Sequence, residues 1–483
     1  MKGDFTRDTF NPIHQFTRVL MQQGRVQLDA DSNEQVAIFW HYLRALAADL
    51  IGPHGGPAHD LGFAIEPVED GPGFSVGPGR YYVNGLLCEN RETVTYVNPS
   101  HCIFPGEVIL EEGRRYLVYL DVWERHLNHI EAPPIREVAL GGPDTASRAQ
   151  VVWQVRPLLL EEDDGNGDSE ARLREQLEML YQQLARARAT GDEAAVIELS
   201  RRIAEIEAEL QALENGNSSC GALLRALLPT TKARLRARAR VAQKPEDPCT
   251  IPPQASYRGA ENQLYRVEIH RPGSAENATF KWSRDNGSVV FPILAVSGQT
   301  VSLAHLGRDG RFTLKEGDWV EAIDDDYTLE GRSSDLLRVE KVFREEQKVL
   351  LSAAPHKVGR DLSRYPFLRR WDQPGTENTG GALPVQEREW LALEDGVQVR
   401  FGGDGDYRSG DYWLIPARTV TGDVEWPLDA EGGPAARSPH GIQHYYAPLA
   451  IITFGEAASV ADCRCVIEPV ARCRRDDDNG NGR

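Results

Sequence analysis

The sequence lacks any apolar run long enough to cross a membrane, and it lacks the short apolar region of a secretory signal. No window approaches the roughly 18 apolar residues of a membrane helix, and no apolar stretch follows the first methionine in the manner of a signal peptide. We therefore expect no direct membrane insertion. We expect assembly in the cytoplasm, followed by an extracellular or particle-associated location that is reached with a particle or by lysis.

The familiar nucleotide-binding and hydrolase motifs are also absent. The chain contains no Walker A loop, no G-x-S-x-G elbow, no H-E-x-x-H helix and no dinucleotide fingerprint. We therefore expect the protein not to be an enzyme and to need no cofactor. An unfamiliar carboxylate-based hydrolase stays open, and its candidate residues would be Asp121, Glu124, Asp285 and Asp324.

Cysteine is scarce, with seven in 483 residues, and an odd number leaves at least one thiol free. Cys463 and Cys465 form a C-x-C pair with Cys473 close behind. Because a zinc site normally needs two close pairs, we expect free thiols there and no metal. Cys220 and Cys249 flank a basic stretch and would bridge only in an oxidising compartment, so the sequence leaves their redox state open.

Positive charge is in the minority, with 54 Lys and Arg against 73 Asp and Glu, a net charge of −19. Such a chain repels phosphate backbones, so we expect no nucleic acid partner. Five cations nevertheless alternate with small apolar residues, and a strand would place all five on one face. We expect this stripe to pair with acidic groups of the chain or of a neighbouring subunit, with an anionic ligand as the alternative; its members are Lys232, Arg234, Arg236, Arg238 and Arg240.

The first 34 residues mix aromatic residues with arginines. The segment is too apolar to be a free arm and too short to be a domain, so we expect it to bury its apolar side chains on the rest of the chain or on a neighbouring subunit. Residues 1–25 should then be removable without unfolding the β domains. The predicted docking and oligomerisation residues are Phe5, Phe10, Phe16, Arg18, Leu20 and Arg25.

Periodicity predicts a mainly β, multi-domain fold with β-sandwich or barrel-like modules. Apolar residues at three- and four-residue spacing predict a helix from Glu34 to Leu50, and period two follows it. Two leucine stripes, separated at Gly191 and Asp192, predict an inserted antiparallel helical hairpin. The expected divisions are 1–60 (docking segment and helix), 61–160 (β domain), 161–220 (inserted hairpin), 221–372 (second β domain), 373–470 (third β region) and 471–483 (charged mobile tail).

Three polar clusters are candidates for a metal or catalytic site, and each can also be explained by an ordinary structural role. Asp164, Asn166, Asp168 and Glu175 have the spacing of a calcium loop, but Ser169 stands where that loop needs glycine, so calcium is only a weak candidate. Strand alternation separates the densest titratable group, which is Asp121, Glu124, His126 and His129. The run Asp324, Asp325 and Asp326 is typical of a solvated turn.

Several segments resemble a domain-of-unknown-function family whose members occur in gene clusters for contractile injection systems and other phage-tail-like particles. They are FTRVLMQQGRVQLDADSNEQ, GRYYVNGLLCEN, YLVYLDVWERH, IREVALGGPDTASRAQVVWQV, YRGAENQLYRVEIH, ATFKWSRDNGSVV, LRRWDQ and GDYWLIPARTVTGDVEWP, and the first is similar to the opening of some tail-fibre proteins.

The resemblance implies a structural component of such a particle at a fibre, baseplate-peripheral or cap-type position. Its partners would be other particle subunits and further copies of itself. The alternative is a carbohydrate-binding β-sandwich protein or glycosidase that meets a cell-surface glycan. Six tryptophans of the second half would matter for that alternative, although strand-like surroundings favour the core for most of them: Trp282, Trp319, Trp371, Trp390, Trp413 and Trp426.

Overall fold

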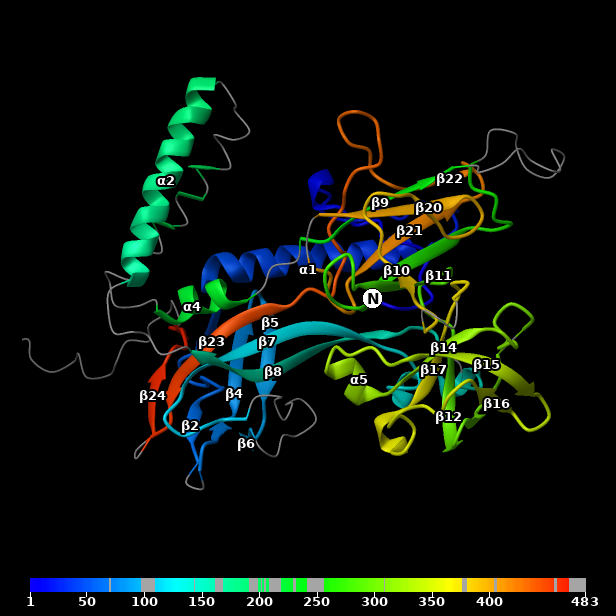
Figure 1. The fold of residues 1–483 in the computed structure, drawn as a ribbon, viewed down its shortest axis with the longest axis horizontal. Helices are drawn as coiled ribbons and strands as arrows, with labels where there is room; N and C mark the ends of the chain where they lie inside the picture. The colour runs from blue at the N-terminus through cyan, green and yellow to red at the C-terminus, as the bar shows by residue number, and fades with distance from the viewer. Residues whose placement is uncertain are drawn as a thin grey trace, which may run out of the picture. The chain divides into compact units, whose positions relative to one another are not determined.

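The computed structural model confirms a mainly β, multi-domain fold with a long N-terminal helix (Figure 1). No helix in the described part of the chain is long and apolar enough to cross a membrane. The structure describes residues 1–68, 71–96, 109–142, 144–160, 168–190, 199–200, 202–203, 206–207, 219–228, 232–240, 256–307, 309–375, 380–403, 406–455 and 458–468.

The chain forms two compact units, and each is assembled from three separate stretches. Unit 1 contains residues 1–42, 124–150 and 230–443, and unit 2 contains residues 43–123, 151–229 and 444–483. Helix α1 (Asp29–Ile51) and strands β7 (Arg115–Leu127) and β8 (Arg148–Leu160) each contain a point where the chain passes from one unit to the other. Contact between distant stretches therefore builds both cores.

A two-layered sandwich forms one half of unit 1. A five-stranded sheet in the order β18-β11-β10-β21-β22 faces a three-stranded sheet in the order β19-β20-β9, and both layers are visible in Figure 1. Trp282, Trp413 and Phe401 fill the core between them. The strands are β9 (Arg234–Ala239), β10 (Gln263–Arg271), β11 (Thr279–Ser283), β18 (Leu383–Pro384), β19 (Leu391–Ala392), β20 (Val397–Gly402), β21 (Tyr412–Arg418) and β22 (Asp423–Val424).

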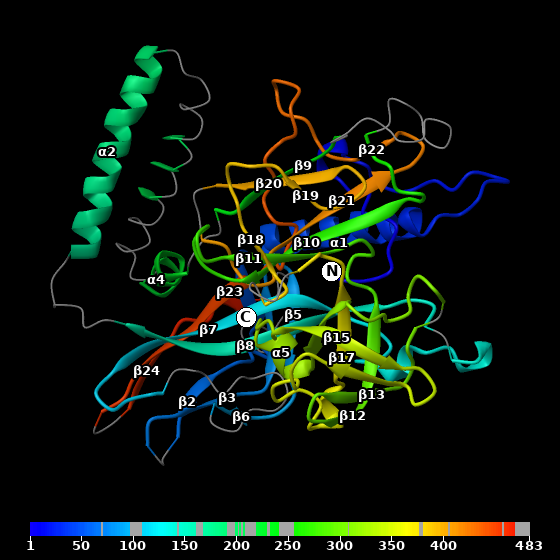
Figure 2. The same ribbon diagram turned by 45° about the vertical axis from the view of Figure 1, so that its right-hand side comes forward.

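A closed barrel forms the other half of unit 1, with the order β12-β13-β16-β15-β14-β17 (Figure 2). Alternate residues such as Val320, Val339 and Leu368 point inward and make its core. The strands are β12 (Val290–Ser297), β13 (Thr300–Leu303), β14 (Trp319–Ile323), β15 (Leu336–Phe343), β16 (Lys348–Leu351) and β17 (Phe367–Trp371).

The acidic run after β14 begins a short helix, α5 (Asp325–Leu329), and the expected solvated turn is wrong. The buried Asp324 carboxylate caps the helix by accepting a hydrogen bond from the Tyr327 amide at 3.1 Å. Short 3₁₀ helices also occur in unit 1, at η1 (Pro12–His14), η2 (Pro133–Ile135), η3 (Val138–Leu140) and η4 (Leu362–Arg364).

Unit 2 joins its early strands to the last strands of the chain. Its sheets have the orders β25-β1-β4-β5, β24-β23-β7-β8 and β2-β3-β6, around a core that includes Phe63, Tyr81 and Leu449. The remaining strands are β1 (His54–Pro57), β2 (Ile65–Pro67), β3 (Phe74–Val76), β4 (Gly79–Val83), β5 (Leu86–Asn90), β6 (Val94–Thr95), β23 (Tyr445–Thr453), β24 (Ser459–Asp462) and β25 (Val466–Ile467).

Two further helices of unit 2 are α2 (Asp168–Thr190) and α4 (Ser219–Leu227). Leu180 and Leu184 of α2 pack with Ile203, which lies in a short helical piece. Gly191 and Asp192, the predicted turn of the hairpin, lie outside the described residues, as do residues 471–483.

Cys463 is not a free thiol, because it forms a disulfide with Cys220 of α4 across a Cα–Cα distance of 6.0 Å. This partner differs from Cys249, which lies outside the described residues together with Cys473. The two cysteines are 243 residues apart in the sequence. Spacing alone does not reveal a pairing of that range.

A buried ionic network joins the sandwich of unit 1 to its barrel. Glu268 of β10 accepts from Arg266 at 2.5 Å and lies 3.5 Å from the Lys281 amine. The same lysine donates to Glu321 of β14 at 2.6 Å, and the Trp371 indole of β17 donates to Glu321 at 2.9 Å. Nearby cations hold the pKa of both carboxyl groups below the usual range, although burial alone would raise it.

The first three residues of the chain belong to this network. The Lys2 amine lies 2.8 Å from Glu268, and the α-amino group donates to the Tyr412 hydroxyl. The Asn286 amide donates to the carbonyl of Met1 at 3.1 Å and to that of Gly3 at 3.0 Å. Burial lowers the pKa of the α-amino group to about 4 and that of Lys2 to about 8.

The sequence predicts that the β domains stay folded without residues 1–25, but these contacts lead us to expect that their removal destabilises unit 1. Their removal takes the Lys2 amine away from Glu268 and leaves the buried Asn286 side-chain amide without its two carbonyl acceptors. An unpaired buried polar group costs much more free energy than the lost contact itself.

We predict that Glu268→Gln lowers the free energy of unfolding of unit 1 by about 3–5 kcal/mol, because three cations lose a buried counter-charge. Glu346→Gln is the matched control, since Glu346 pairs with Lys348 at the surface of the same unit. The control should lose less than about 1 kcal/mol. Urea unfolding of both variants measures the difference, and equal losses would contradict the role assigned to the network.

Candidate functional site

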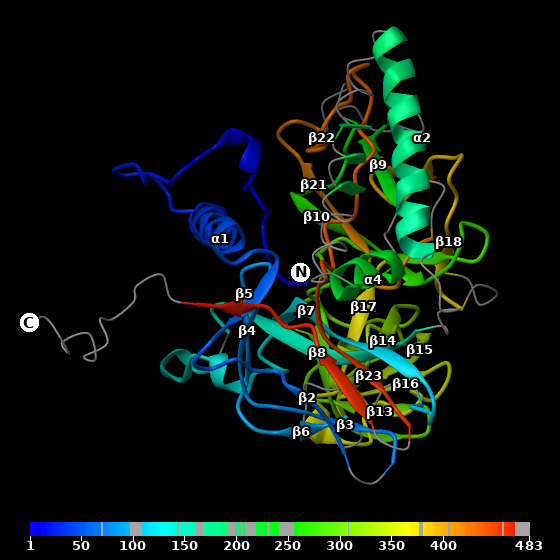
Figure 3. The same cartoon turned by 90° about the vertical axis from the view of Figure 1, so that its left-hand side faces the viewer.

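The predicted docking residues divide into two groups. Phe5 packs against the His126 ring with centroids 5.5 Å apart, and Phe10 packs against His41 at 5.4 Å. Phe16 and Leu20 are 58% and 71% exposed, and Arg18 and Arg25 are also exposed. Figure 3 looks nearly along α1 and shows this stretch looping out beside the helix before it returns to the start of α1. The segment is therefore attached at its beginning and leaves its second half in water.

Helix α1 continues this apolar surface. Val36, Phe39, Leu43, Leu46 and Leu50 follow 3-4-3-4 spacing and are 66%, 56%, 55%, 42% and 76% exposed. That spacing is the a/d pattern of a coiled-coil seam. Ile38, on another side of the helix, is buried. A helix that is apolar on both its inner and outer sides is normally covered all round. We refer to these five residues as the α1 seam.

The predicted cationic stripe lies on β9 and its flanks, and its strand form is confirmed. Ala233, Leu235 and Ala237 are buried in the sandwich core, and the intervening cations lie on the outer face. Arg400 of β20 pairs in register with Arg236 and extends the charge to the neighbouring strand.

The expected pairing of this stripe with acidic groups of the same chain is absent from the described part of the chain. There, no carboxylate forms an ion pair with Arg400 or with any of the five predicted cations. Burial lowers the pKa of Arg238, and the charges of Arg240 and Arg400 lower it further. Like charges therefore dominate its surroundings.

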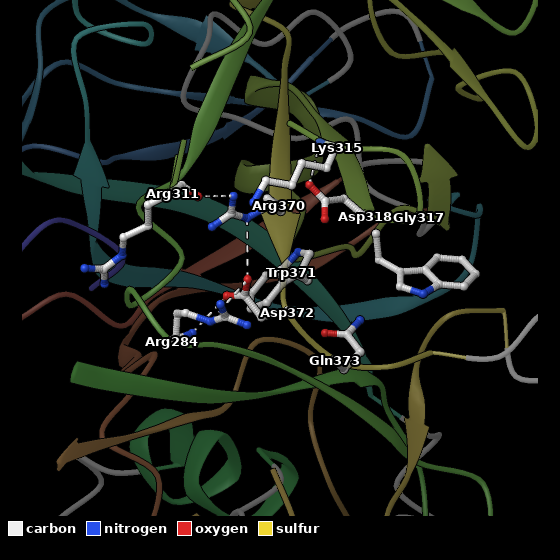
Figure 4. Close-up of a pocket in the computed structure, with 10 residues that line it drawn as sticks. Arg284, Arg311, Lys315, Gly317, Asp318, Arg370, Trp371, Asp372 and Gln373 are labelled. Carbon is white, nitrogen blue, oxygen red and sulfur yellow. Dashed lines mark hydrogen bonds and ion pairs between the residues drawn. The ribbon is translucent and has the colours of Figure 1, made fainter. Parts of the chain in front are cut away.

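A polar pocket of about 190 Å³ lies where the barrel meets the sandwich inside unit 1 (Figure 4). Four cations and two carboxylates line it, together with two tryptophans, a glycine and a glutamine: Arg284, Arg311, Lys315, Gly317, Asp318, Trp319, Arg370, Trp371, Asp372 and Gln373. β11 ends just before Arg284, β17 carries Arg370 and Trp371, and the turn into β14 supplies Lys315 and Asp318.

The arginines of this pocket are already paired. Arg284 lies 2.9 Å from Glu394, and Arg311 lies 2.5 Å from Asp285. Arg370 lies 3.5 Å from Asp372 and donates to the Arg311 carbonyl at 2.9 Å. The pocket is therefore an internally compensated polar cluster and has little charge to offer a ligand.

The titratable cluster around β7 has separate partners. Asp121 is buried, contacts the His444 ring nitrogen at 2.6 Å and lies 3.3 Å from Arg156. His129 pairs with Asp144 at 2.8 Å, and His126 packs on Phe5. Glu124 is partly buried. Asp121, His126 and His129 therefore each have a different partner.

The weak calcium candidate cannot be assembled from the described residues. Asp164 and Asn166 lie outside them, Asp168 is the first residue of α2, and Glu175 is exposed on the same helix. Within the described ranges, no group of three or more His, Cys, Asp or Glu side chains could hold a metal ion.

The tryptophans considered for glycan binding pack into the protein. Trp282, Trp319, Trp371 and Trp413 are buried. Trp426 packs against the sandwich core, and the Trp390 ring lies 3.9 Å from the Arg238 guanidinium and 5.0 Å from that of Arg400. The four buried tryptophans therefore present no open ring on which a sugar could stack.

Sequence reasoning missed the two features that depend on three-dimensional placement. The 3-4-3-4 spacing of α1 was visible, but an amphipathic helix normally turns that side toward its own core. The Lys2–Glu268 pair joins residues 266 positions apart, and no local pattern marks it.

Comparison with known proteins places the chain in a family without assigning a role. The model described as "Family of unknown function (DUF6519)" matches residues 1–477. No curated protein matches. A solved structure titled "Crystal structure of TssK" is similar at 9% identity with a TM-score of 0.18, over 80% of this chain and 98% of that chain. That similarity is too low to carry an argument, whereas the resemblance to a family of unknown function is confirmed.

We predict that acid destabilises unit 1 from about pH 6.5 downward. Burial, with Arg369 nearby, lowers the pKa of His126 to about 3, and burial, with Lys281 nearby, lowers that of His270 to about 4. Between about pH 4 and 6.5 the unfolded chain binds protons that the folded unit excludes, so each histidine removes about 1.4 kcal/mol of stability per pH unit on acidification.

His126→Gln should therefore reduce the slope of unfolding free energy against pH by the contribution of one proton. His356→Gln, at an exposed histidine of the same unit, should leave the slope unchanged. Urea titrations between about pH 4.5 and 7.5 test both, and an unaltered slope in His126→Gln would show that this histidine is not kept neutral.

Proposed function

We propose that this chain, which belongs to the family of unknown function DUF6519, is a structural assembly component of a contractile, phage-tail-like injection particle. The sequence resemblance supports the setting, and a fibre, baseplate-peripheral or cap-type position fits its irregular β modules. The observation that carries the proposal is the α1 seam. Exposed apolar residues at heptad spacing are rare on monomeric proteins, because they leave apolar surface in water. Subunits of an assembly carry such surfaces where they contact one another.

The α1 seam supplies apolar surface that association would bury. Fully burying a Val, Leu or Phe side chain contributes about 1.5–3 kcal/mol, and these five still have 42–76% of their surface exposed, so together they offer roughly 4–9 kcal/mol. Association opposes this with roughly 4–15 kcal/mol of lost motional freedom. The seam alone is therefore near the threshold, and the exposed Phe16 and Leu20 beside α1 add to it.

The occupant that fits the α1 seam is another copy of α1. A heptad face is complementary to another heptad face, because knobs at a and d enter holes formed by the same spacing. Within the described residues of this chain, the leucines of α2 are already used against Ile203. In a homo-oligomer held together by α1, the helices of neighbouring copies would bury the α1 seam. The β units of several copies would then lie in one assembly.

The same proposal assigns no catalysis to the chain. The pocket arginines are neutralised by neighbouring carboxylates, and the acidic candidates Asp121, Asp285 and Asp324 each serve a histidine, an arginine or a helix cap. A glycan-binding role has less support, because the tryptophans pack inward or against arginines. Assembly in the cytoplasm and later presence on a particle follow from the proposed setting.

We predict that Phe39→Asp combined with Leu43→Asp converts the oligomer to a monomer and abolishes incorporation into particles. Association would bury the two new carboxylates in the α1 seam, and burying an unpaired charge is costly in free energy. The control is Val138→Asp with Leu140→Asp, two exposed apolar residues on η3 of unit 1. Sedimentation velocity and particle purification measure both effects. An oligomer unchanged by the α1 variant, or lost equally in the control, would contradict the assignment.

A further inference from the structure

The outer face of the three-stranded sheet of unit 1 carries a concentration of positive charge. Lys232, Arg234, Arg236, Arg238 and Arg240 follow one another at every second position, and Arg400 lies beside Arg236 on β20. In the described residues none of the six forms an ion pair with a carboxylate. The net charge of the chain is −19, so the sign of the charge on this face is opposite to that of the chain as a whole.

The core below this face holds the cations in a straight row. Leu235 and Ala237 are anchored in the sandwich core, so β9 cannot rotate its arginines inward. Register with β20 fixes the strand along its length, with Arg236 opposite Arg400 and Arg238 opposite Gln398. Successive cations are then about 6.7 Å apart, and the row is about 27 Å long.

Contacts with neighbouring side chains also restrict the guanidinium groups of two arginines on this face. The Arg238 guanidinium donates to Gln398 at 2.9 Å and stacks on Trp390 at 3.9 Å, and Arg400 lies 5.0 Å from the same ring. Cation–π contact keeps the charge while it limits the motion of the side chain. A guanidinium so fixed loses less entropy when it binds a carboxylate in bidentate geometry.

The row matches one ligand geometry particularly well. An extended peptide that carries Asp or Glu at every second residue presents carboxylates at the same spacing of about 6.7 Å. A longer polyanion, such as a nucleic acid, would run past the ends of the row and meet a chain that is acidic overall. The Arg238 guanidinium already stacks on Trp390, so a base would have to compete with it for that face of the ring.

We propose that this face, made of the five alternating cations of the β9 segment together with Arg400, binds an extended acidic polypeptide segment of about nine residues with carboxylates at alternate positions. The α1 seam lies on a different element, so this inference does not depend on the proposed oligomer. It supplies the chain with a second, electrostatic contact of defined direction.

Binding of a fluorescent ten-residue peptide of alternating Glu and Ser to the full-length protein tests the proposal by anisotropy at low salt. We expect saturable binding that weakens about tenfold between 50 and 300 mM salt, and no binding of the Gln-Ser peptide of the same length. Arg236→Glu with Arg240→Glu should weaken binding by at least about tenfold, since two attractive contacts become repulsive.

The matched control is Arg344→Glu with Arg360→Glu, which changes net charge equally at two exposed cations of the barrel half of unit 1. It should bind the acidic peptide like the unaltered protein, and circular dichroism melting should show both double variants folded. If both double variants lost the same peptide affinity, net charge alone would explain the loss, and the proposal would be overturned. Absence of peptide binding, or tighter binding of a ten-residue oligothymidine than of the acidic peptide, would overturn it as well.

Discussion

Unit 1 depends on two buried carboxylates that are shared among cations from distant parts of the chain. Glu268 and Glu321 connect β10, β11 and β14, so one ionic network fixes the sandwich against the barrel. Removing either carboxylate leaves uncompensated cations in a region of low dielectric, which is far costlier than the pair itself is stabilising. The network therefore makes the relative placement of the two halves of this unit specific, where apolar packing alone would allow sliding.

The same network determines where the N-terminal segment begins. Lys2 and the carbonyls of Met1 and Gly3 are held by Glu268 and Asn286, and Phe5 covers His126. The chain then leaves the interior, and its later apolar residues find little of unit 1 to pack on. Ordering the first residues thus limits where the exposed stretch can lie. A docking surface that starts from a fixed point loses less conformational entropy on association than a free arm does.

The two candidate surfaces use different physical forces. The α1 seam is apolar and would associate through burial, which is strong but has little directional preference. The β9 face is cationic and would select a partner by charge spacing, which gives specificity and faster encounter more than affinity. Under the two proposals, the chain would join copies of itself through the α1 seam and select a different partner through the β9 face. The arginines of the polar pocket, in contrast, are neutralised by carboxylates of the same unit.

Local patterns in the sequence determined the strands, α1 and the alternation at Lys232 to Arg240, because a period of two or of three to four residues fixes which side chains share a face. The same patterns could not say which face meets the core. Spacing alone left Val36, Phe39 and Leu43 indistinguishable from a buried stripe, and only the tertiary structure leaves them in water. Tertiary structure likewise decided the Cys220–Cys463 bond and the Lys2–Glu268 pair, because contacts between residues more than 200 positions apart depend on how whole sheets stack.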